Sequence, residues 1–478
     1  MTRWVGGGTA GEERGARRRI TPGQTGCGPP HPVLPSSLPV SARFPNCRHG
    51  VGYCSSSPWR AGRVTVRTAL PRARALPSGA PRKTERGRVP DVTVRASPPS
   101  DEPTASALEG RSATAAQRLG EHIQELYPPT CRPEYARDLL CCDEAWAALS
   151  ESSRLRLADR LHHVLGGPVR HLLEAGGRQW RLSMVVTFAE VLGCRTEQLD
   201  VLAAAVELLH TGSLIVDDVQ DAAPLRRGRA AAHVVYGTAT AINAGTSAYF
   251  AVDRVIRRIA SDDAELRAVL YDHYLGAVRS AHAGQALDIE GHREEMDRAV
   301  YSGNADQLRE LLLLTHQLKS GAVVGAALAM AGVMVNADRR LTAALSSFGT
   351  AVGTAYQITD DVADLIGVPR TGALTKRVGE DLFNGKVTMP LVCAVGLVPE
   401  HDLAEVWGAV REGGADPSTV RAATDLLIRY DVPERCRSEA ETLLDEAWGR
   451  LERLLPPVAC ADSLRDLAHR IVFTGRVA

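Results

Sequence analysis

Apolar residues recur at intervals of three and four along most of the chain after about residue 113. Segments 153–165 and 309–334 repeat them at i, i+3, i+4 and i+7, which is the period of a helix with one buried face. Alternation with a period of two is nearly absent, and clusters such as Gly166-Gly167-Pro168 separate the apolar segments. The pattern predicts one all-α domain over 113–478 with ten or more helices.

The first 112 residues show neither period and are rich in Arg, Pro, Gly and Ser. Residues 1–100 carry 17 Lys and Arg against 4 Asp and Glu, whereas the remaining chain carries 39 against 52. Such a segment buries too little apolar surface to offset its ordering entropy. We interpret 1–112 as a targeting peptide or a non-native upstream extension, with a disordered basic arm as the third reading. Nothing resembling a nucleic-acid module supports nucleic-acid binding, so we expect none.

Composition indicates what the core consists of and which compartment suits the chain. Hydrophobic residues make up 44% of the chain but aromatic residues only 5%, so the core must consist mainly of Ala, Leu and Val. The ten cysteines have no metal-type spacing, and we expect reduced structural thiols in a cytoplasmic protein. No uninterrupted apolar run reaches the roughly 18 residues of a membrane span, which predicts no stable membrane insertion.

A first acidic cluster, Asp217-Asp218-Val219-Gln220-Asp221, follows a strongly apolar stretch at 201–216. On one helix, Asp217 and Asp221 are four residues apart and share a face. Two like charges beside apolar turns are costly unless a cation compensates them. Carboxylate oxygens suit Mg²⁺, which commonly bridges carboxylates to substrate phosphates.

A second cluster, Asp360-Asp361-Val362-Ala363-Asp364, lies in the apolar segment 353–366 and repeats the same spacing. Either cluster alone could be a solvated helix face or a helix cap. Two such clusters, 143 positions apart and both within apolar helices, favour facing helices that share metal ions.

Basic residues flank both clusters, which suggests a phosphate ligand. Arg226 and Arg227 follow the first cluster, Lys376 and Lys386 follow the second, and the segment 176–181 carries two arginines. These residues could simply form ion pairs with the carboxylates. Alternatively, Arg and Lys would hold the phosphate oxygens that the metal leaves free. A Walker-type GxxxxGK[ST] loop is absent, which excludes a P-loop nucleotide enzyme.

These motifs together resemble the trans-prenyl diphosphate synthase family, and most closely its geranylgeranyl diphosphate synthases. Residues 207–237 (ELLHTGSLIVDDVQDAAPLRRGRAAAHVVYG) carry the closest match. Gly284-Gln285 with Asp288, Lys319-Ser320, the second cluster and residues 379–391 follow in family order. The resemblance implies a large helical bundle of the isoprenoid synthase type with a central cavity, and a homodimer.

The resemblance also implies a reaction and roles for individual residues. Isopentenyl diphosphate would be condensed with an allylic diphosphate by metal-assisted ionisation, condensation and deprotonation. About three Mg²⁺ ions, with Mn²⁺ as a substitute, would assist the departing diphosphate. The metal ligands would be Asp217, Asp218, Asp221, Asp360, Asp361 and Asp364. The allylic diphosphate would contact Arg226, Lys319, Ser320, Gln357, Lys376 and Lys386. Isopentenyl diphosphate would contact Arg178, Arg181, His210 and Arg227. For His210, a hydrogen-bonded core histidine is the alternative.

The sequence departs from the family pattern at GGRQWRL (176–182), where the family usually has GGKRxRP. Gln179 removes one charge and Leu182 replaces the proline, which weakens the predicted isopentenyl diphosphate site. A class I terpene cyclase on the same scaffold is therefore one rival interpretation. A non-catalytic partner subunit of a heteromeric synthase is a second, separate one. Gly212 and Ser213, one turn before Asp217, would leave the product tunnel open and predict geranylgeranyl diphosphate, with 25 carbons as the next choice. Close helix packing through Gly212 is the alternative.

Overall fold

The computed structural model describes residues 118–130, 132–177, 179–192, 197–367, 378–455 and 461–474. Within this part of the chain the expected all-α architecture is confirmed, because the only paired strands are β1 (Leu225–Arg226) and β2 (Arg229–Ala230). The four cysteines described there, Cys141, Cys142, Cys393 and Cys436, form no disulfide. The domain boundary expected near residue 113 lies outside the described residues.

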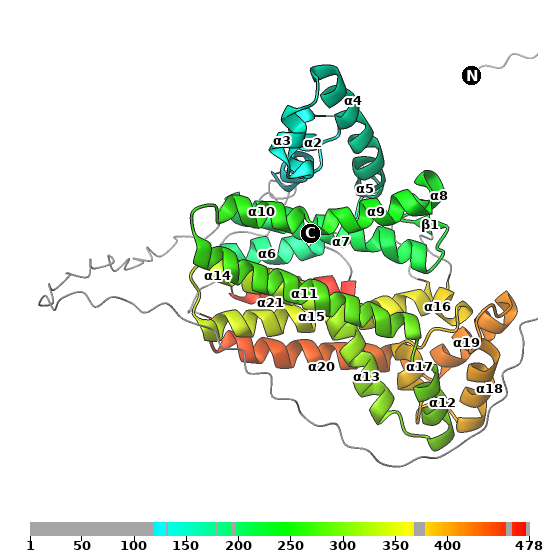
Figure 1. Cartoon of the computed structure of the whole chain (residues 1–478). Coiled ribbons are helices and arrows are strands. Elements are labelled where there is room, and N and C mark those ends of the chain that lie inside the picture. The colour runs from blue at the N-terminus through cyan, green and yellow to red at the C-terminus, as the bar shows by residue number, and fades with distance from the viewer. Residues whose placement is uncertain are drawn as a thin grey trace, which may run out of the picture. The chain divides into compact units, whose positions relative to one another are not determined.

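The described helices fall into three groups in chain order, and Figure 1 labels most of them. The first group is α2 (Pro133–Leu140), α3 (Asp143–Ala147), α4 (Glu151–Leu161), η1 (His162–Gly166), α5 (Gly167–Glu174), α6 (Trp180–Val191) and α7 (Glu197–Gln220). The central group is α8 (Ala232–Tyr236), α9 (Thr238–Tyr249), α10 (Ala251–Ile259), α11 (Ala264–Glu290), α12 (Arg293–Ser302), α13 (Asp306–His316), η2 (Gln317–Gly321), α14 (Ala322–Met334) and α15 (Arg339–Ile366). The last group is α16 (Glu380–Phe383), α17 (Met389–Ala394), α18 (Glu400–Val410), α19 (Pro417–Arg429), α20 (Val432–Glu452), α21 (Ala461–His469) and η3 (Arg470–Thr474).

The long helices form the framework of the bundle. In Figure 1, α11, α15 and α20 extend in nearly the same direction, and α14 packs against both α11 and α15. Helix α7 packs against α6, α9 and α10. Helix α7 leads into the first acidic cluster, α15 carries the second, and α11 packs near both. The packing of these helices therefore determines where the acidic side chains lie.

Side-chain caps fix where two of these helices begin. The Asp263 carboxylate accepts a hydrogen bond from Leu266 N at 2.9 Å at the start of α11. Asp338 does the same for Leu341 N at 2.8 Å at the start of α15. Such caps satisfy backbone N–H groups that lack a partner inside the helix. The register of both helices, and hence the direction of their acidic residues, is thereby defined.

Glycine allows α15 to approach η2 closely. A Cβ on Gly353 would lie 2.7 Å from the Ser320 backbone oxygen, which is closer than any real side chain tolerates. The glycine therefore brings η2 against α15 one turn before Gln357. This contact places Ser320 beside Gln357, one turn before Asp361 of the second cluster, whereas Lys319 lies beside Asp217 of the first.

Two helices, Glu197–Gln220 and Asp306–Met334, are long and apolar enough to cross a membrane by length and composition alone. The most apolar 18-residue stretch of the first helix is 78% buried inside the protein, and that of the second helix is 56% buried. Core helices commonly pass the same test, and this burial accounts for their apolar composition.

Candidate active site

The first acidic cluster lies at the end of α7. A helix C-terminus carries a partial negative charge, so carboxylates there need cations close by. The Asp218 side chain is only 1% exposed, and its Oδ1 accepts a hydrogen bond from Arg226 Nε at 2.6 Å. The Arg226 guanidinium also lies 3.7 Å from Asp217. The β1–β2 turn that directly follows α7 thus returns a cation to the cluster.

Asp217 is the point where α7 meets α11 and η2. Its Oδ1 accepts a hydrogen bond from Gln285 Nε2 at 2.9 Å and lies 3.4 Å from Lys319 Nζ. Burial acts to raise the pKa of Asp217, but Lys319, Lys386 and Arg226 outweigh it and hold the pKa below its usual range. Asp217 therefore stays ionised and offers a carboxylate to this space.

Asp288 on α11 holds two lysines in the same region. Its Oδ2 lies 2.6 Å from Lys319 Nζ and 2.8 Å from Lys386 Nζ. Burial works against ionisation, yet the two lysines keep the pKa of Asp288 well below the ordinary value. Lys319 and Lys386, predicted as diphosphate contacts, are thus brought together. The prediction gave no role to Asp288 or Gln285, although both stood in the matched motif, and only the tertiary contact reveals them.

Asp221 lies just beyond the end of α7. Desolvation and the like charge of Asp217 raise its pKa to about 6. The negative charges of Asp217 and Asp221 repel each other, and a bound cation would relieve that repulsion. This crowding fits a divalent metal with oxygen ligands.

The second cluster projects from α15 toward α16 and α17. Asp361 is buried, and its two oxygens accept hydrogen bonds from Gln357 Nε2 at 3.0 Å and Met389 N at 3.1 Å. Burial raises its pKa to about 7. Asp364 Oδ2 accepts a hydrogen bond from Asp381 N at 3.1 Å. Both side chains thus help to orient the start of α16 and α17, in addition to any role with a metal.

Arginines connect the two clusters electrostatically. Arg226 is stabilised in its charged form by Asp218 and Asp217, and also by Asp360 of the second cluster. The charge of Asp360 also acts on Arg181 from α6. The charges of Asp217 and Asp360 thus both raise the pKa of Arg226.

A basic region lies beside the clusters, between α6 and α7. Arg181 is 9% exposed, and its guanidinium carbon lies 4.3 Å from the centroid of the Trp180 ring. Burial, together with Arg181, Arg227 and Arg226, holds the pKa of His210 well below its usual value, so this imidazole is neutral. Sequence reasoning missed the buried Glu207: burial raises its pKa, and the charges of Arg181 and Arg227 act in the opposite direction.

The loop before α6 approaches Arg227 very closely. Arg227 donates to the backbone oxygens of Leu172, at 3.2 Å, and of Gly176. A Cβ on Gly177 would lie 2.8 Å from the Arg227 guanidinium, so a larger residue here would displace the end of that side chain. The predicted site residues Arg178 and Lys376 lie outside the described residues.

Ser320 and Gln357 form a direct contact across η2 and α15. Ser320 Oγ donates to Gln357 Oε1 at 2.7 Å, and Gln357 Nε2 in turn donates to Asp361. The amide of Gln357 is thereby oriented by two neighbours, which leaves little freedom for its rotation.

The two positions predicted to set chain length differ in environment. A Cβ on Gly212 would lie 2.4 Å from the Gly245 backbone oxygen and 2.8 Å from Ala248 Cβ. Close packing of α7 against α9 therefore explains Gly212, which is the alternative weighed from the sequence. Ser213 is half-buried and its Oγ donates to the His210 backbone oxygen at 2.8 Å.

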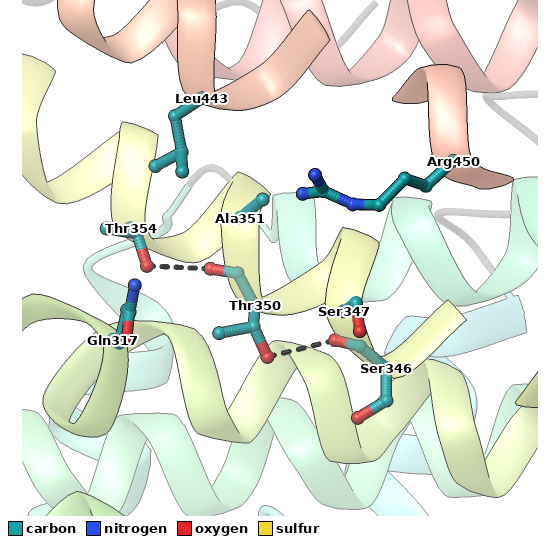
Figure 2. A pocket seen from close by; sticks show the side chains of 8 residues that line it. All are labelled: Gln317, Ser346, Ser347, Thr350, Ala351, Thr354, Leu443 and Arg450. Carbon is teal, nitrogen blue, oxygen red and sulfur yellow. Dashed lines mark hydrogen bonds between the residues drawn. The ribbon is translucent and has the colours of Figure 1, made fainter. Parts of the chain in front are cut away.

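A separate polar cavity of about 260 Å³ lies between η2, α15 and α20 (Figure 2). It is lined by Gln317, Ser346, Ser347, Thr350, Ala351, Thr354, Leu443 and Arg450. The hydroxyls of Thr350 and Thr354 donate to carbonyl oxygens of α15 itself, as the dashed lines show. None of the acidic-cluster residues lines this cavity.

This helical bundle, with two acidic clusters and cationic side chains between them, defines an enzyme that acts on diphosphate esters. Comparison with known proteins identifies the family, because the polyprenyl synthetase family model matches residues 162–427. The chain belongs to the polyprenyl synthetase family. It is a prenyl transferase that joins isopentenyl diphosphate to an allylic diphosphate, and the cyclase and non-catalytic interpretations are not favoured.

Individual relatives agree with this assignment. A short chain isoprenyl diphosphate synthase of Methanothermobacter thermautotrophicus is 31% identical over 64% of this chain and 89% of its own length. A heptaprenyl diphosphate synthase component 2 of Geobacillus stearothermophilus is 29% identical over 64% and 88%. The crystal structure of a geranylgeranyl pyrophosphate synthetase from Pyrococcus horikoshii is 28% identical with a TM-score of 0.59, over 77% of this chain and 98% of that one.

Proposed function

We propose that the chain makes geranylgeranyl diphosphate with Mg²⁺ held between the two acidic clusters. The observation that carries the proposal is a series of contacts between the clusters. Lys319 Nζ lies 3.4 Å from Asp217 of the first cluster, and the adjacent Ser320 donates to Gln357, which donates to Asp361 of the second cluster. In this proposal Asp217, Asp221 and Asp360 are the direct metal ligands, and Asp218, Asp361 and Asp364 assist. Mn²⁺ would substitute, since it accepts the same oxygen donors.

The proposed mechanism assigns one task to each group of side chains. Bound Mg²⁺ supplies charge neutralisation for the departing diphosphate. Arg226, Lys319 and Lys386 hold the diphosphate oxygens while the allylic C–O bond breaks and its electron pair leaves with diphosphate. The double bond of isopentenyl diphosphate then attacks the allylic carbon, and a proton is lost to the released diphosphate.

The neighbouring basic region is the proposed isopentenyl diphosphate site. Arg181 and Arg227 would bind its diphosphate, and neutral His210 would donate a hydrogen bond without adding charge. The charges of Arg181 and Arg227 act on the buried Glu207 beside them, although burial still raises the pKa of that carboxyl. Arg178 and Lys376 are proposed contacts on the strength of the family motif.

The remaining proposals concern the whole chain. Residues 113–478 would form the catalytic domain, which would act as a homodimer in the cytoplasm without nucleic-acid partners or stable membrane insertion. The proposed twenty-carbon product rests on the small residue Ser213, one turn before Asp217, which would leave the product tunnel open.

The test is to incubate the purified full chain with Mg²⁺, isopentenyl diphosphate and each allylic diphosphate, and to read the products by mass spectrometry. Asp217→Asn and Asp360→Asn should each lower kcat by a factor of about 10²–10³, because each removes charge that stabilises the leaving group. The exposed Asp272 on α11 provides a matched control as Asp272→Asn. A hydrocarbon or alcohol formed from farnesyl diphosphate alone would instead establish a cyclase.

A further inference from the structure

The corner between α11 and α12 gathers three side chains that bind metals well. Glu290 is the last residue of α11, His292 directly precedes α12, and Glu295 lies in the first turn of α12. Gly291 and His292 both have positive φ, which makes the turn tight. A ring nitrogen of His292 and one carboxylate oxygen of each glutamate lie within 4.8 Å of one another.

Hydrogen bonding fixes which nitrogen of His292 is available. His292 is 4% exposed, and its Nε2 lies 2.9 Å from Thr315 Oγ1. The Thr315 hydroxyl donates its single hydrogen to Leu311 O at 2.9 Å, so it accepts from His292. Nε2 therefore carries the hydrogen and Nδ1 keeps a lone pair. No hydrogen bond within the described residues uses this Nδ1. Metal-ligating histidines are commonly oriented by a hydrogen bond from the other ring nitrogen.

A capping contact and an ion pair each occupy only one oxygen of the acidic pair. A glutamate at the position of Glu295 often accepts the backbone N–H of the residue before the helix. Here Glu290 Oε2 already accepts the His292 N–H at 3.2 Å. Glu295 is 20% exposed and bonds through Oε1 to Arg298 at 2.7 Å, which leaves its second oxygen for another ligand.

We propose that Glu290, His292 and Glu295 form a site for a divalent transition metal, with Zn²⁺ as the preferred ion. One imidazole with two carboxylates matches the nitrogen and oxygen ligands of Zn²⁺, and water would complete a tetrahedron. Mg²⁺ is less suited, because it prefers oxygen ligands and retains its water. Ligand atoms around Zn²⁺ are about 3.3 Å apart, so the exposed Glu290 side chain closes onto the ion by rotation.

The position of this site gives it a bracing role. Glu290 follows Asp288 by two residues, and Thr315 precedes Lys319 by four residues on α13–η2. A metal would join the end of α11 to the start of α12, and His292 would extend this link to α13. The ion thus stabilises the elements that carry the Asp288–Lys319 pair, without taking part in prenyl transfer.

The test uses the full chain, stripped of metal and then held in excess Mg²⁺ so that the aspartate clusters are occupied. Zn²⁺ binding is measured by calorimetry, and Co²⁺ binding by visible absorption. We expect about one equivalent of Zn²⁺, a rise in Tm, and a Co²⁺ spectrum of nitrogen and oxygen ligands without a thiolate band.

Two variants and one control make the result specific. Glu290→Gln combined with Glu295→Gln removes both carboxylates, and His292→Asn removes the imidazole while tolerating positive φ. Both variants should bind about one equivalent of Zn²⁺ less than wild type, and their Tm should not rise when Zn²⁺ is added. Glu294→Gln, on the same turn but outside the cluster, should keep both. The proposal is overturned if the wild-type chain binds no Zn²⁺ in excess Mg²⁺, or if the double variant binds as much as wild type.

Discussion

Lys319 on η2 and Asp288 on α11 lie 2.6 Å apart, and the same carboxylate oxygen also lies 2.8 Å from Lys386. One acidic side chain therefore holds two cations that would otherwise repel each other. This arrangement preorganises both lysines where the leaving diphosphate is proposed to lie.

The first prediction concerns this pair. Asp288→Asn leaves two largely buried ammonium groups without their shared counter-charge, and should lower the free energy of unfolding by about 1–3 kcal/mol. Urea denaturation measures the effect, with Asp272→Asn on the same helix as the control. An unchanged midpoint in Asp288→Asn would show that the lysines readily find other partners.

The second prediction concerns the contact between α7 and α9. Gly212→Ala places a Cβ 2.4 Å from a backbone oxygen, and overpacking of this kind should cost about 1–3 kcal/mol. Gly276→Ala in α11 is the matched control, because nothing lies within 4 Å of its added Cβ. This control should gain up to about 1 kcal/mol from helix propensity. Equal Tm values for the two variants would contradict the packing assignment.

The third prediction concerns product length. Ser213→Phe adds an aromatic ring beside the space predicted for the growing chain, without the backbone collision of Gly212. The main product should shorten to fifteen carbons, as measured by chromatography of the dephosphorylated products. Ser213→Ala removes only the hydroxyl and should leave the twenty-carbon product in place. If both variants make the wild-type product, Ser213 does not line the tunnel.

The fourth prediction concerns pH. His316 Nε2 lies 3.5 Å from Asp361 Oδ2. Burial lowers the pKa of His316 to about 3 and raises that of Asp361 to about 7. Because the pKa of His316 is lowered, its burial costs stability as the pH falls below about 6.5. Because the pKa of Asp361 is raised, its burial costs stability as the pH rises above about 4. Between these values the two slopes oppose each other and nearly cancel.

His316→Gln removes one of the two slopes. In metal-free buffer, the free energy of unfolding of this variant should fall as the pH rises from about 4.5 to about 6.5. The fall relative to wild type should be about 1 kcal/mol for each pH unit. Urea midpoints at several pH values measure the difference. His282→Gln, an exposed histidine on α11, is the control and should follow wild type. A variant curve parallel to the wild-type curve would contradict the assignment of the two pKa shifts.

The sequence predicted the all-α fold and the two acidic helices well, because both depend on local patterns. The i, i+4 spacing of Asp217 and Asp221 is visible in five residues, and the apolar period of α7 and α15 surrounds each cluster. The role of Asp288 was not predictable in this way, since its partners Lys319 and Lys386 are 31 and 98 residues distant. Gly212 shows a second limit, because a small residue fits an open tunnel and a tight helix contact equally well.

The π-type turn η2 has a consequence for how this chain tolerates insertions and deletions. A π-type turn is accommodated by one residue more than a regular helix needs. Deleting one residue from Gln317–Gly321 would restore regular winding, and would rotate Lys319 and Ser320 by about 100° relative to α14. Lys319 would then turn away from Asp217, although length and composition hardly change. This turn should therefore tolerate substitutions better than insertions or deletions, because a change in length would move the Lys319 ammonium group away from the first acidic cluster.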